Sequence, residues 1–211
     1  MKHVIQTALV ALSLTFPASL AKAAEITVAG GCFWCVEADF EKVKGVSEAV
    51  SGYTGGTTRN PTYKQVTGGN TGHYEVVEIT YDPDTVSRGR LYDLFFRSID
   101  PFDDGGQFCD RGASYRPAIF VDGAAERADA EAAKARAEKA LGRAVAVPIL
   151  DAKRFYEAED FHQDYYKSTE KTLTRFGYID RADAYARYRE GCRRDQRVRQ
   201  IWGDDAPFVG G

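Results

Sequence analysis

The 211-residue sequence predicts a single α/β or α+β domain with long ordered loops. Strand-like and helix-like segments alternate along the chain, which is the pattern of mixed α/β architectures. No internal repeat is visible, so a solenoid or propeller is excluded. Apolar residues make up 44% of the chain, enough to build one compact core.

The first 23 residues read as a secretory signal peptide, followed by the folded domain over 24–211. A basic start at Lys2 precedes an apolar run that ends in small residues near Ala23. A membrane anchor is the alternative, but the run is short and contains several polar residues. Removing the segment takes away two lysines and no acid, so the net charge of −3 becomes −5 and a basic nucleic-acid footprint is absent. We therefore expect an exported, periplasmic, soluble monomer.

The first predicted elements of the mature chain are a strand over 26–29, a turn at Gly30 and Gly31, and a helix. The helix has Phe33, Val36, Phe40 and Val43 at spacings of three or four, which gives one apolar face. Cys32 then lies at the start of the helix. Free backbone N–H groups and the helix dipole at this position favour a thiolate over a thiol.

The remaining segments continue the alternation of strands and helices. Residues 51–74, rich in Gly, Thr and Asn, and residues 102–117 show no period and predict long loops, which often carry function. Glycine at 142 ends the Ala-rich helix. Strands are predicted at 74–83, 118–123 and 144–150, and helices at 88–101, 124–142 and 180–202.

The chain has four cysteines: Cys32, Cys35, Cys109 and Cys192. An even number in an exported protein is typical of structural disulfides, which would make this a non-enzymatic, disulfide-stabilised secreted domain. A zinc site normally needs a second close pair of ligands, and only Cys32 and Cys35 are close in sequence. The pattern therefore predicts no metal.

A CxxC pair after a strand and at a helix start also indicates a thiol-disulfide oxidoreductase of the periplasm. In such proteins the tryptophan usually stands outside the pair, whereas Phe33 and Trp34 fill it here. Two bulky aromatic residues beside a thiol favour the wall of an apolar pocket, although both rings could also be ordinary core residues.

Five ordered motifs resemble those of the A-type peptide methionine sulfoxide reductases. They are "GGCFWCVEADFEKVKGV", "SGYTGG", "NPTYKQV", "TGHYEVVEITYDP" and "DRGASYRPAIF", and the resemblance extends from about residue 26 to residue 188. It implies a two-layer α/β sandwich with a mixed sheet. It also implies reduction of the S epimer of methionine sulfoxide, in proteins or as the free amino acid, without a cofactor.

By this resemblance Cys32 is the nucleophile, and Phe33 and Trp34 form the pocket for the substrate methyl group. Glu75 corresponds to the family's buried acid. The chemistry requires such a group, because a sulfoxide sulfur is a poor electrophile until its oxygen is protonated or strongly hydrogen-bonded. Burial beside aromatic rings would raise the pKa of Glu75 and keep it protonated. Without the motif, a solvated glutamate on a strand would be the ordinary interpretation.

The resemblance also assigns Tyr63 and Tyr115 as hydrogen-bond donors to the sulfoxide oxygen and Asp110 as a carboxylate that positions substrate. Donors aimed at an oxygen that gains charge follow the principle of an oxyanion hole. His162, in "AEDFHQDYY", is interpreted as a structural hydrogen-bonding residue.

Attack by Cys32 would leave a sulfenic acid, which condenses readily with another thiol. Cys192 is the first candidate for this resolving thiol, on a C-terminal segment from about residue 178 in which arginines follow it and favour its thiolate. Cys35, where the family usually has glycine, and Cys109 are further candidates. Disulfides between Cys109 and Cys192 or between Cys35 and Cys109 remain open, and an exported enzyme of this kind implies a thioredoxin-like reductant as partner.

Overall fold

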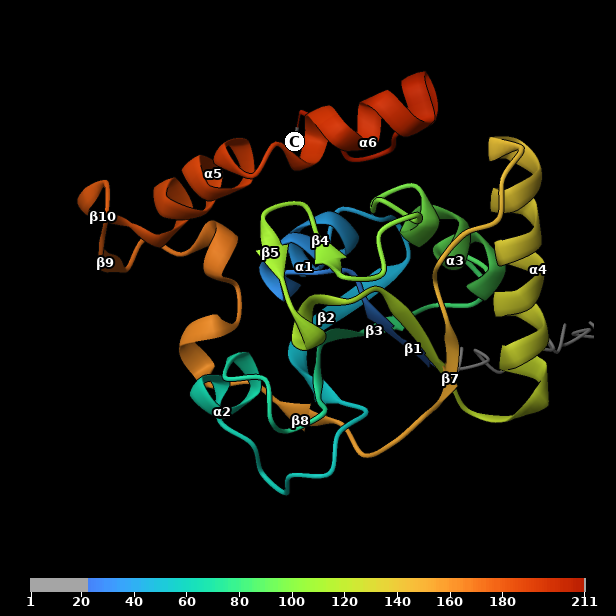
Figure 1. Cartoon of the computed structure of the whole chain (residues 1–211), viewed down its shortest axis with the longest axis horizontal. Coiled ribbons are helices and arrows are strands. Elements are labelled where there is room, and N and C mark those ends of the chain that lie inside the picture. The colour runs from blue at the N-terminus through green and yellow to red at the C-terminus, as the bar shows by residue number, and fades with distance from the viewer. Residues whose placement is uncertain (1–22, 211) are drawn as a thin grey trace, which may run out of the picture.

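The computed structural model describes residues 23–210 (Figure 1). The predicted signal peptide over 1–23 lies outside the described residues except for its last residue. Within residues 23–210, no helix is both long enough and apolar enough to span a membrane.

A six-stranded mixed sheet forms the centre of the domain. Its strand order is β7-β6-β1-β3-β2-β8, in which β6 and β7 are parallel and all other neighbours are antiparallel. The mixed sheet expected from the motifs is therefore confirmed. The strands are β1 (Ala24–Ala29), β2 (Val46–Thr54), β3 (Tyr74–Tyr81), β6 (Ala118–Val121), β7 (Ile149–Asp151) and β8 (Tyr156–Glu157).

Side chains of the central strand β3 alternate between the two faces of the sheet. Val77, Ile79 and Tyr81 belong to the main core, whereas Tyr74 and Val76 pack in a smaller cluster on the opposite face. Glu75 is in phase with Val77, so its carboxyl points toward the main core rather than toward solvent. The strand register therefore decides between the two interpretations of Glu75 that the sequence allowed.

The helices α1 (Phe33–Phe40), α3 (Arg88–Phe96) and α4 (Gly123–Leu141) pack on the main-core face. In Figure 1, α3 and α4 lie side by side at one end of the domain. The buried positions of α4 are small, with Ala130, Ala133 and Ala137 in the core, so this helix approaches its neighbours closely. Gly142 ends α4 with a positive φ of 63°, as the sequence predicted.

Several predicted segments differ from the structure. The helix expected over 180–202 is broken into two at Arg193, whose φ is 57°, and the loop expected over 102–117 contains a short two-stranded hairpin. The stretch read as a loop over 51–74 contains the second half of β2 and a short helix, α2 (Tyr63–Thr67). Thr62 begins α2 with a capping box, in which its side chain accepts the Gln65 N–H and Gln65 accepts the Thr62 N–H. The predicted strand over 144–150 is shorter and shifted, because pairing with β6 begins only at Ile149, after Pro148.

The C-terminal segment covers the side of the domain where α1 begins (Figure 1). It contains a hairpin of β9 (Lys171–Thr174) and β10 (Gly177–Asp180), followed by α5 (Arg181–Gly191) and α6 (Arg194–Trp202). The shorter elements of the fold are β4 (Gly106–Gln107), β5 (Asp110–Arg111), η1 (Ala113–Tyr115), η2 (Asp160–His162), η3 (Tyr165–Lys167) and η4 (Gly203–Asp205).

Buried charges join this segment to α1. Asp39 is fully buried, and its carboxylate lies 2.8 Å from a guanidinium nitrogen of Arg189 and 3.8 Å from one of Arg194. Arg194 also donates to the carbonyl oxygens of Gly30 (3.1 Å) and Ser98 (2.9 Å). Because unpaired buried charges are costly, Asp39 is the counter-charge on which the docking of α5 and α6 depends.

Replacement of Asp39 by Ala should therefore destabilise the protein strongly. The buried guanidinium of Arg194 would lose its carboxylate and that of Arg189 would keep only Asp195, and a broken buried pair costs about 3–5 kcal/mol. Denaturant unfolding measures this loss, and limited proteolysis should show early cleavage in the C-terminal segment. Asp151→Ala is the control, since the Asp151–Arg127 pair is exposed and such pairs contribute less than about 1 kcal/mol. Equal losses in both variants would contradict this role of Asp39.

Candidate active site

The N-terminus of α1 places Cys32 at the centre of the site. Strand β1 ends at Ala29, and Gly31 turns the chain with a φ of 84°, a conformation that favours glycine. Cys32 is the N-cap residue of α1, as the sequence predicted. Its side chain is only 6% exposed.

Glu75 reaches the same helix start from β3. Its Oε2 accepts a hydrogen bond from the Phe33 N–H at 3.1 Å, and the residue is 1% exposed. Burial raises the pKa of Glu75 to about 8, and the nearby Asp110 carboxylate adds to this, while the hydrogen bonds from Phe33 and Tyr115 oppose it. The Glu75 carboxyl is therefore mainly protonated at neutral pH.

Tyr63 and Tyr115 both lie at this carboxyl. Tyr63 is the first residue of α2, where its N–H donates to Glu159 at 2.9 Å, and Tyr115 ends η1. The two phenol groups are hydrogen-bonded to each other, and the Glu75 charge helps to raise the pKa of each after the larger effect of burial. Both hydroxyls therefore stay protonated and can donate hydrogen bonds.

Asp110, in β5, completes the polar groups near the thiol. Burial raises its pKa, a hydrogen bond from Tyr188 and the charge of Arg194 oppose this, and its own charge acts on Cys32. Its Oδ2 accepts a hydrogen bond from the Tyr188 hydroxyl. The sequence motifs did not indicate Tyr188; the only hint was its position in "YARYREGC", one helical turn before a cysteine.

Aromatic rings enclose the other side of the site. Phe33 is buried and its ring stacks with that of Tyr63 at 6.2 Å between centroids, while Trp34 stacks on Tyr165 at 3.9 Å. His162 lies between them, 5.1 Å from Phe33 and 5.5 Å from Trp34.

The expected structural hydrogen bonds of His162 are not formed. Neither of its ring nitrogens has a hydrogen-bond partner among the residues that the structure describes, and the nearest carboxylate oxygen, of Glu159, is 3.9 Å away. Burial lowers the pKa of His162 to about 4, so the ring is neutral. His162 therefore acts as part of the aromatic wall, and its role as a hydrogen-bonding residue was wrongly predicted.

The Cys32 sulfur is a thiol at rest, not the thiolate that its helix position favours. Burial raises its pKa well above the ordinary value, as do a hydrogen bond with Cys35 and the charges of Glu75 and Asp110. Loss of hydration and neighbouring acids thus outweigh the helix dipole. The same hydrogen bond lowers the pKa of Cys35, with a smaller contribution from Arg194.

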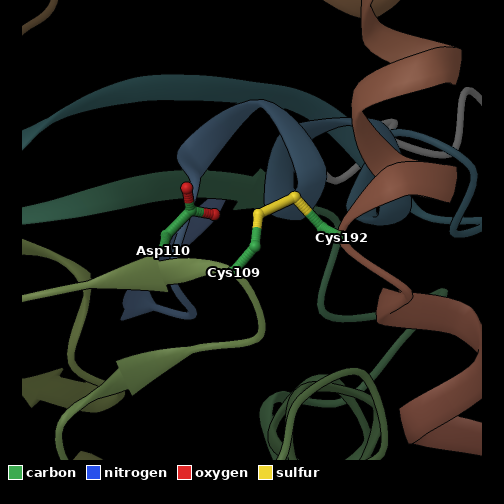
Figure 2. Close-up of side chains that lie close together, drawn as sticks. All are labelled: Cys109, Asp110 and Cys192. Carbon is green, nitrogen blue, oxygen red and sulfur yellow. A yellow bond between two sulfur atoms is a disulfide. The ribbon is translucent and has the colours of Figure 1, made fainter.

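Cys109 and Cys192 form a disulfide (Figure 2), while Cys32 and Cys35 are free thiols. Two structural disulfides, one of the alternatives drawn from the sequence, are therefore excluded. Cys192 caps the end of α5, and Cys109 directly precedes β5. The sulfur hydrogen-bonded to Cys32 is that of Cys35, whereas Cys192 was the first candidate from the sequence.

Ligand atoms of Cys109, Asp110 and Cys192 lie within 4.8 Å of one another, close enough for a metal site. Two of the three are joined in the disulfide, and a disulfide sulfur lacks the thiolate character that zinc binding needs. In this oxidation state the cluster is not a metal site.

Comparison with known proteins supports a single family. The family model described as peptide methionine sulfoxide reductase matches residues 24–201. Peptide methionine sulfoxide reductase MsrA 2 of Caulobacter vibrioides is 47% identical over 93% of this chain and 94% of its own, and MsrA of Bacillus velezensis is 43% identical over 84% and 95%.

Solved structures give the same result. Reduced Mxr1 from Saccharomyces cerevisiae aligns with a TM-score of 0.67 at 30% identity, covering 80% of this chain and 98% of its own. Methionine sulfoxide reductase A of Corynebacterium diphtheriae aligns with a TM-score of 0.61 at 31% identity, covering 72% and 76%. The expected two-layer α/β fold agrees with these structures. The chain belongs to the peptide methionine sulfoxide reductase family and is an enzyme that reduces methionine sulfoxide.

Proposed function

We propose that Cys32 attacks the sulfur of methionine S-sulfoxide, in proteins or as the free amino acid, with Glu75 as the proton donor. The observation that carries this proposal is the Glu75 carboxyl, which has a pKa of about 8 and contacts the helix start at Cys32. A carboxyl that is protonated at neutral pH can activate a sulfoxide oxygen, which an ordinary carboxylate cannot.

In the first step the oxygen passes from the substrate sulfur to the Cys32 sulfur. Glu75 gives its proton to this oxygen, and the Cys32 thiol proton returns to Glu75 as the thiol attacks. The sulfoxide is reduced by two electrons to methionine, and Cys32 is oxidised by two, to a sulfenic acid. The reaction uses the thiol proton, which replaces the one that Glu75 gives to the oxygen. A raised pKa of Cys32 in the resting enzyme is therefore compatible with this chemistry.

The groups around the thiol supply the remaining requirements. Tyr63 and Tyr115 donate hydrogen bonds to the oxygen as its negative charge grows. Phe33 and Trp34 take up the methyl group, beside the neutral ring of His162. Asp110 accepts a hydrogen bond from the substrate chain.

Cys35 then resolves the sulfenic acid. Its sulfur attacks the Cys32 sulfur, a disulfide forms as the S–O bond breaks, and the hydroxyl of the sulfenic acid leaves as water with the proton of the Cys35 thiol. Two observations support Cys35 over Cys192 for this step. The Cys35 sulfur is hydrogen-bonded to Cys32, and the pKa of Cys35 is lowered by this hydrogen bond and by the charges of Arg194 and Arg189. Exchange with the thiols of Cys109 and Cys192 would then restore Cys32 and Cys35, and the disulfide in the structure corresponds to the end of this relay.

A thioredoxin-like dithiol protein is the proposed reductant of the Cys109–Cys192 disulfide. Cys109 is exposed, and a cleft beside the disulfide, lined by Phe108, Arg193, Gln196 and Arg197, gives a partner access to it. One solved structure of Mxr1 from Saccharomyces cerevisiae is that of its complex with Trx2.

Residues 1–23 are proposed to direct the chain out of the cytoplasm and to be removed. The mass of the protein purified from a bacterial periplasm tests this. Loss of the first 23 residues is expected, whereas an intact N-terminus on exported or cytoplasmic protein would contradict a cleaved signal.

Substitution of Glu75 by Gln should lower kcat/KM by about 10²–10⁴-fold, the usual contribution of a general acid. In the unmodified enzyme kcat/KM should fall as the pH rises above about 8, because the required proton is present below the pKa of Glu75 and absent above it. The measurement is the rate of methionine formation in a single turnover across this pH range.

Glu78→Gln provides the matched control for this experiment, since Glu78 is on the same strand but three residues away from the site. It should retain the activity and the decline above pH 8. If Glu75→Gln shows the same alkaline decline, another group is responsible for it and Glu75 is not the acid.

Cysteine variants should separate the resolving thiol from the relay thiols. With one equivalent of sulfoxide, Cys35→Ser should release one methionine and accumulate a Cys32 sulfenic acid, because the adjacent thiol is missing. Cys192→Ser should instead form a Cys32–Cys35 disulfide. Peptide mapping by mass spectrometry distinguishes these products. A direct Cys32–Cys192 disulfide formed as fast in Cys35→Ser as methionine is released would return the resolving role to Cys192.

A further inference from the structure

Tyr188 of α5 occupies the substrate side of the site. Its hydroxyl donates to the Asp110 carboxylate, and its ring meets Trp34 edge-on at 6.3 Å between centroids and 84° between planes. After burial, the charges of Cys32 and Cys35 are the largest influences that raise its pKa, so the phenol also lies near both thiols. One side chain thus contacts the proposed positioning carboxylate, the pocket wall and the neighbourhood of the nucleophile.

The rest of α5 seals the same region. Ala184 and Tyr185 pack in one apolar cluster with Cys32 and Cys35, and Tyr166 and Tyr188 lie against it. This cover explains why Cys32 is only 6% exposed. Tyr188 thus lies beside Trp34 and Asp110, the two side chains that the proposed function assigns to substrate.

The disulfide joins the two segments that this contact brings together. Cys109 directly precedes Asp110, and Figure 2 shows their side chains adjacent, with Cys192 bonded across from α5. The Cys192 N–H donates to the Tyr188 carbonyl at 2.9 Å, so Tyr188 is one helical turn from the bonded sulfur. The Cα atoms of Cys109 and Cys192 are 4.9 Å apart. The covalent bond therefore holds Tyr188 against Asp110.

We propose that Tyr188 is a redox-controlled plug of the substrate site. While the Cys109–Cys192 disulfide is intact, the Tyr188 ring stands in the place of substrate at Asp110 and Trp34, and reduction of this disulfide releases it. The proposal rests on the proposed function, because it takes Asp110 and Trp34 as substrate contacts.

Two residues beside the disulfide have a left-handed backbone conformation. Phe108 and Arg193, each next to one bonded cysteine, have φ values of 54° and 57°. Residues with a side chain adopt this left-handed conformation at a cost and keep it where surrounding structure enforces it. Breaking the disulfide removes one such constraint on both residues.

The anchors on either side define what can move. Arg194 fixes the start of α6 through hydrogen bonds to Gly30 and Ser98, and Arg189 keeps α5 paired with Asp39. Because Arg189 adjoins Tyr188 and stays paired, release of Tyr188 is a rotation of its side chain away from Asp110, with both helices still docked.

Such a plug would keep substrate out of the site while both relay cysteines, Cys109 and Cys192, are oxidised. With Cys109 and Cys192 oxidised, another sulfoxide would trap Cys32 and Cys35 as a second disulfide. Reduction by a dithiol converts the Cys109–Cys192 bond to two thiols and the dithiol to its own disulfide, with two electrons transferred. The same event that restores the relay thus opens the site.

The test compares two forms of the full mature chain: fully reduced, and oxidised only at Cys109–Cys192, as verified by peptide mapping. A short peptide containing methionine S-sulfoxide is mixed rapidly with each form, without reductant, and the first methionine released is timed. If the plugged arrangement holds about nine-tenths of the oxidised molecules, its rate should be about tenfold below that of the reduced form.

Tyr188→Ala should bring the two forms of the variant within about twofold of each other, because the plug is absent in both. Tyr178→Ala is the matched control: Tyr178 is in the same C-terminal segment but is 67% exposed, and the gap of about tenfold should persist. Alkylation of Cys32, which requires no sulfoxide, should likewise be faster after reduction in the unmodified chain and equally fast in both forms of Tyr188→Ala.

Equal first-turnover rates in the two forms of the unmodified chain would overturn the plug, as would an undiminished gap in Tyr188→Ala. Both of these outcomes leave methionine formation by Cys32 intact. A chain that forms no methionine in either form, with Cys32 still open to alkylation, would instead refute the proposed function.

Discussion

The hydrogen bond from the Phe33 N–H to Glu75 is the interaction on which the site depends. It joins the start of α1, where Cys32 lies, to a carboxyl on the core face of β3. Water is excluded there, so the carboxyl keeps its proton to about pH 8, while the single N–H contact is too weak to restore an ordinary acidity. Burial and this one contact together fix a proton donor beside a thiol that is also protonated at rest.

The C-terminal segment supplies the walls and the covalent switch of the site. Its docking relies on Asp39, a buried carboxylate that faces Arg189 and Arg194. Those arginines also lower the pKa of Cys35, so the ions that hold the segment in place influence the proposed resolving thiol. Stability and redox chemistry are thus coupled through one buried charge cluster.

Local patterns predicted the central part of the molecule well. The strand, glycine turn and helix around Cys32 follow from apolar spacing and from Gly31, and the face of Glu75 follows from strand alternation once the sheet is known. The Cys32 sulfur is a thiol, not the thiolate that the helix dipole favours, because the distant α5 helps to bury it and the charge of Asp110 in β5 raises its pKa further.

The sequence did not indicate the Tyr188–Asp110 contact, and it left the Cys109–Cys192 disulfide as one of two open pairings. Each joins residues about 80 positions apart, which only tertiary packing brings together. The ring nitrogens of His162 likewise lack hydrogen-bond partners among the described residues because Phe33, Trp34 and Tyr63 enclose the ring, which no local motif indicates.

The protonation state of Glu75 can be observed directly by infrared difference spectroscopy. The carbonyl band of a protonated carboxyl is followed from mildly acidic to alkaline pH in the unmodified enzyme and in Glu75→Gln. Glu37, whose pKa burial raises to about 7, contributes to both samples and cancels in their difference. The account predicts a band that disappears with a midpoint near pH 8 and is missing from Glu75→Gln. A difference spectrum showing Glu75 already ionised at neutral pH would contradict it.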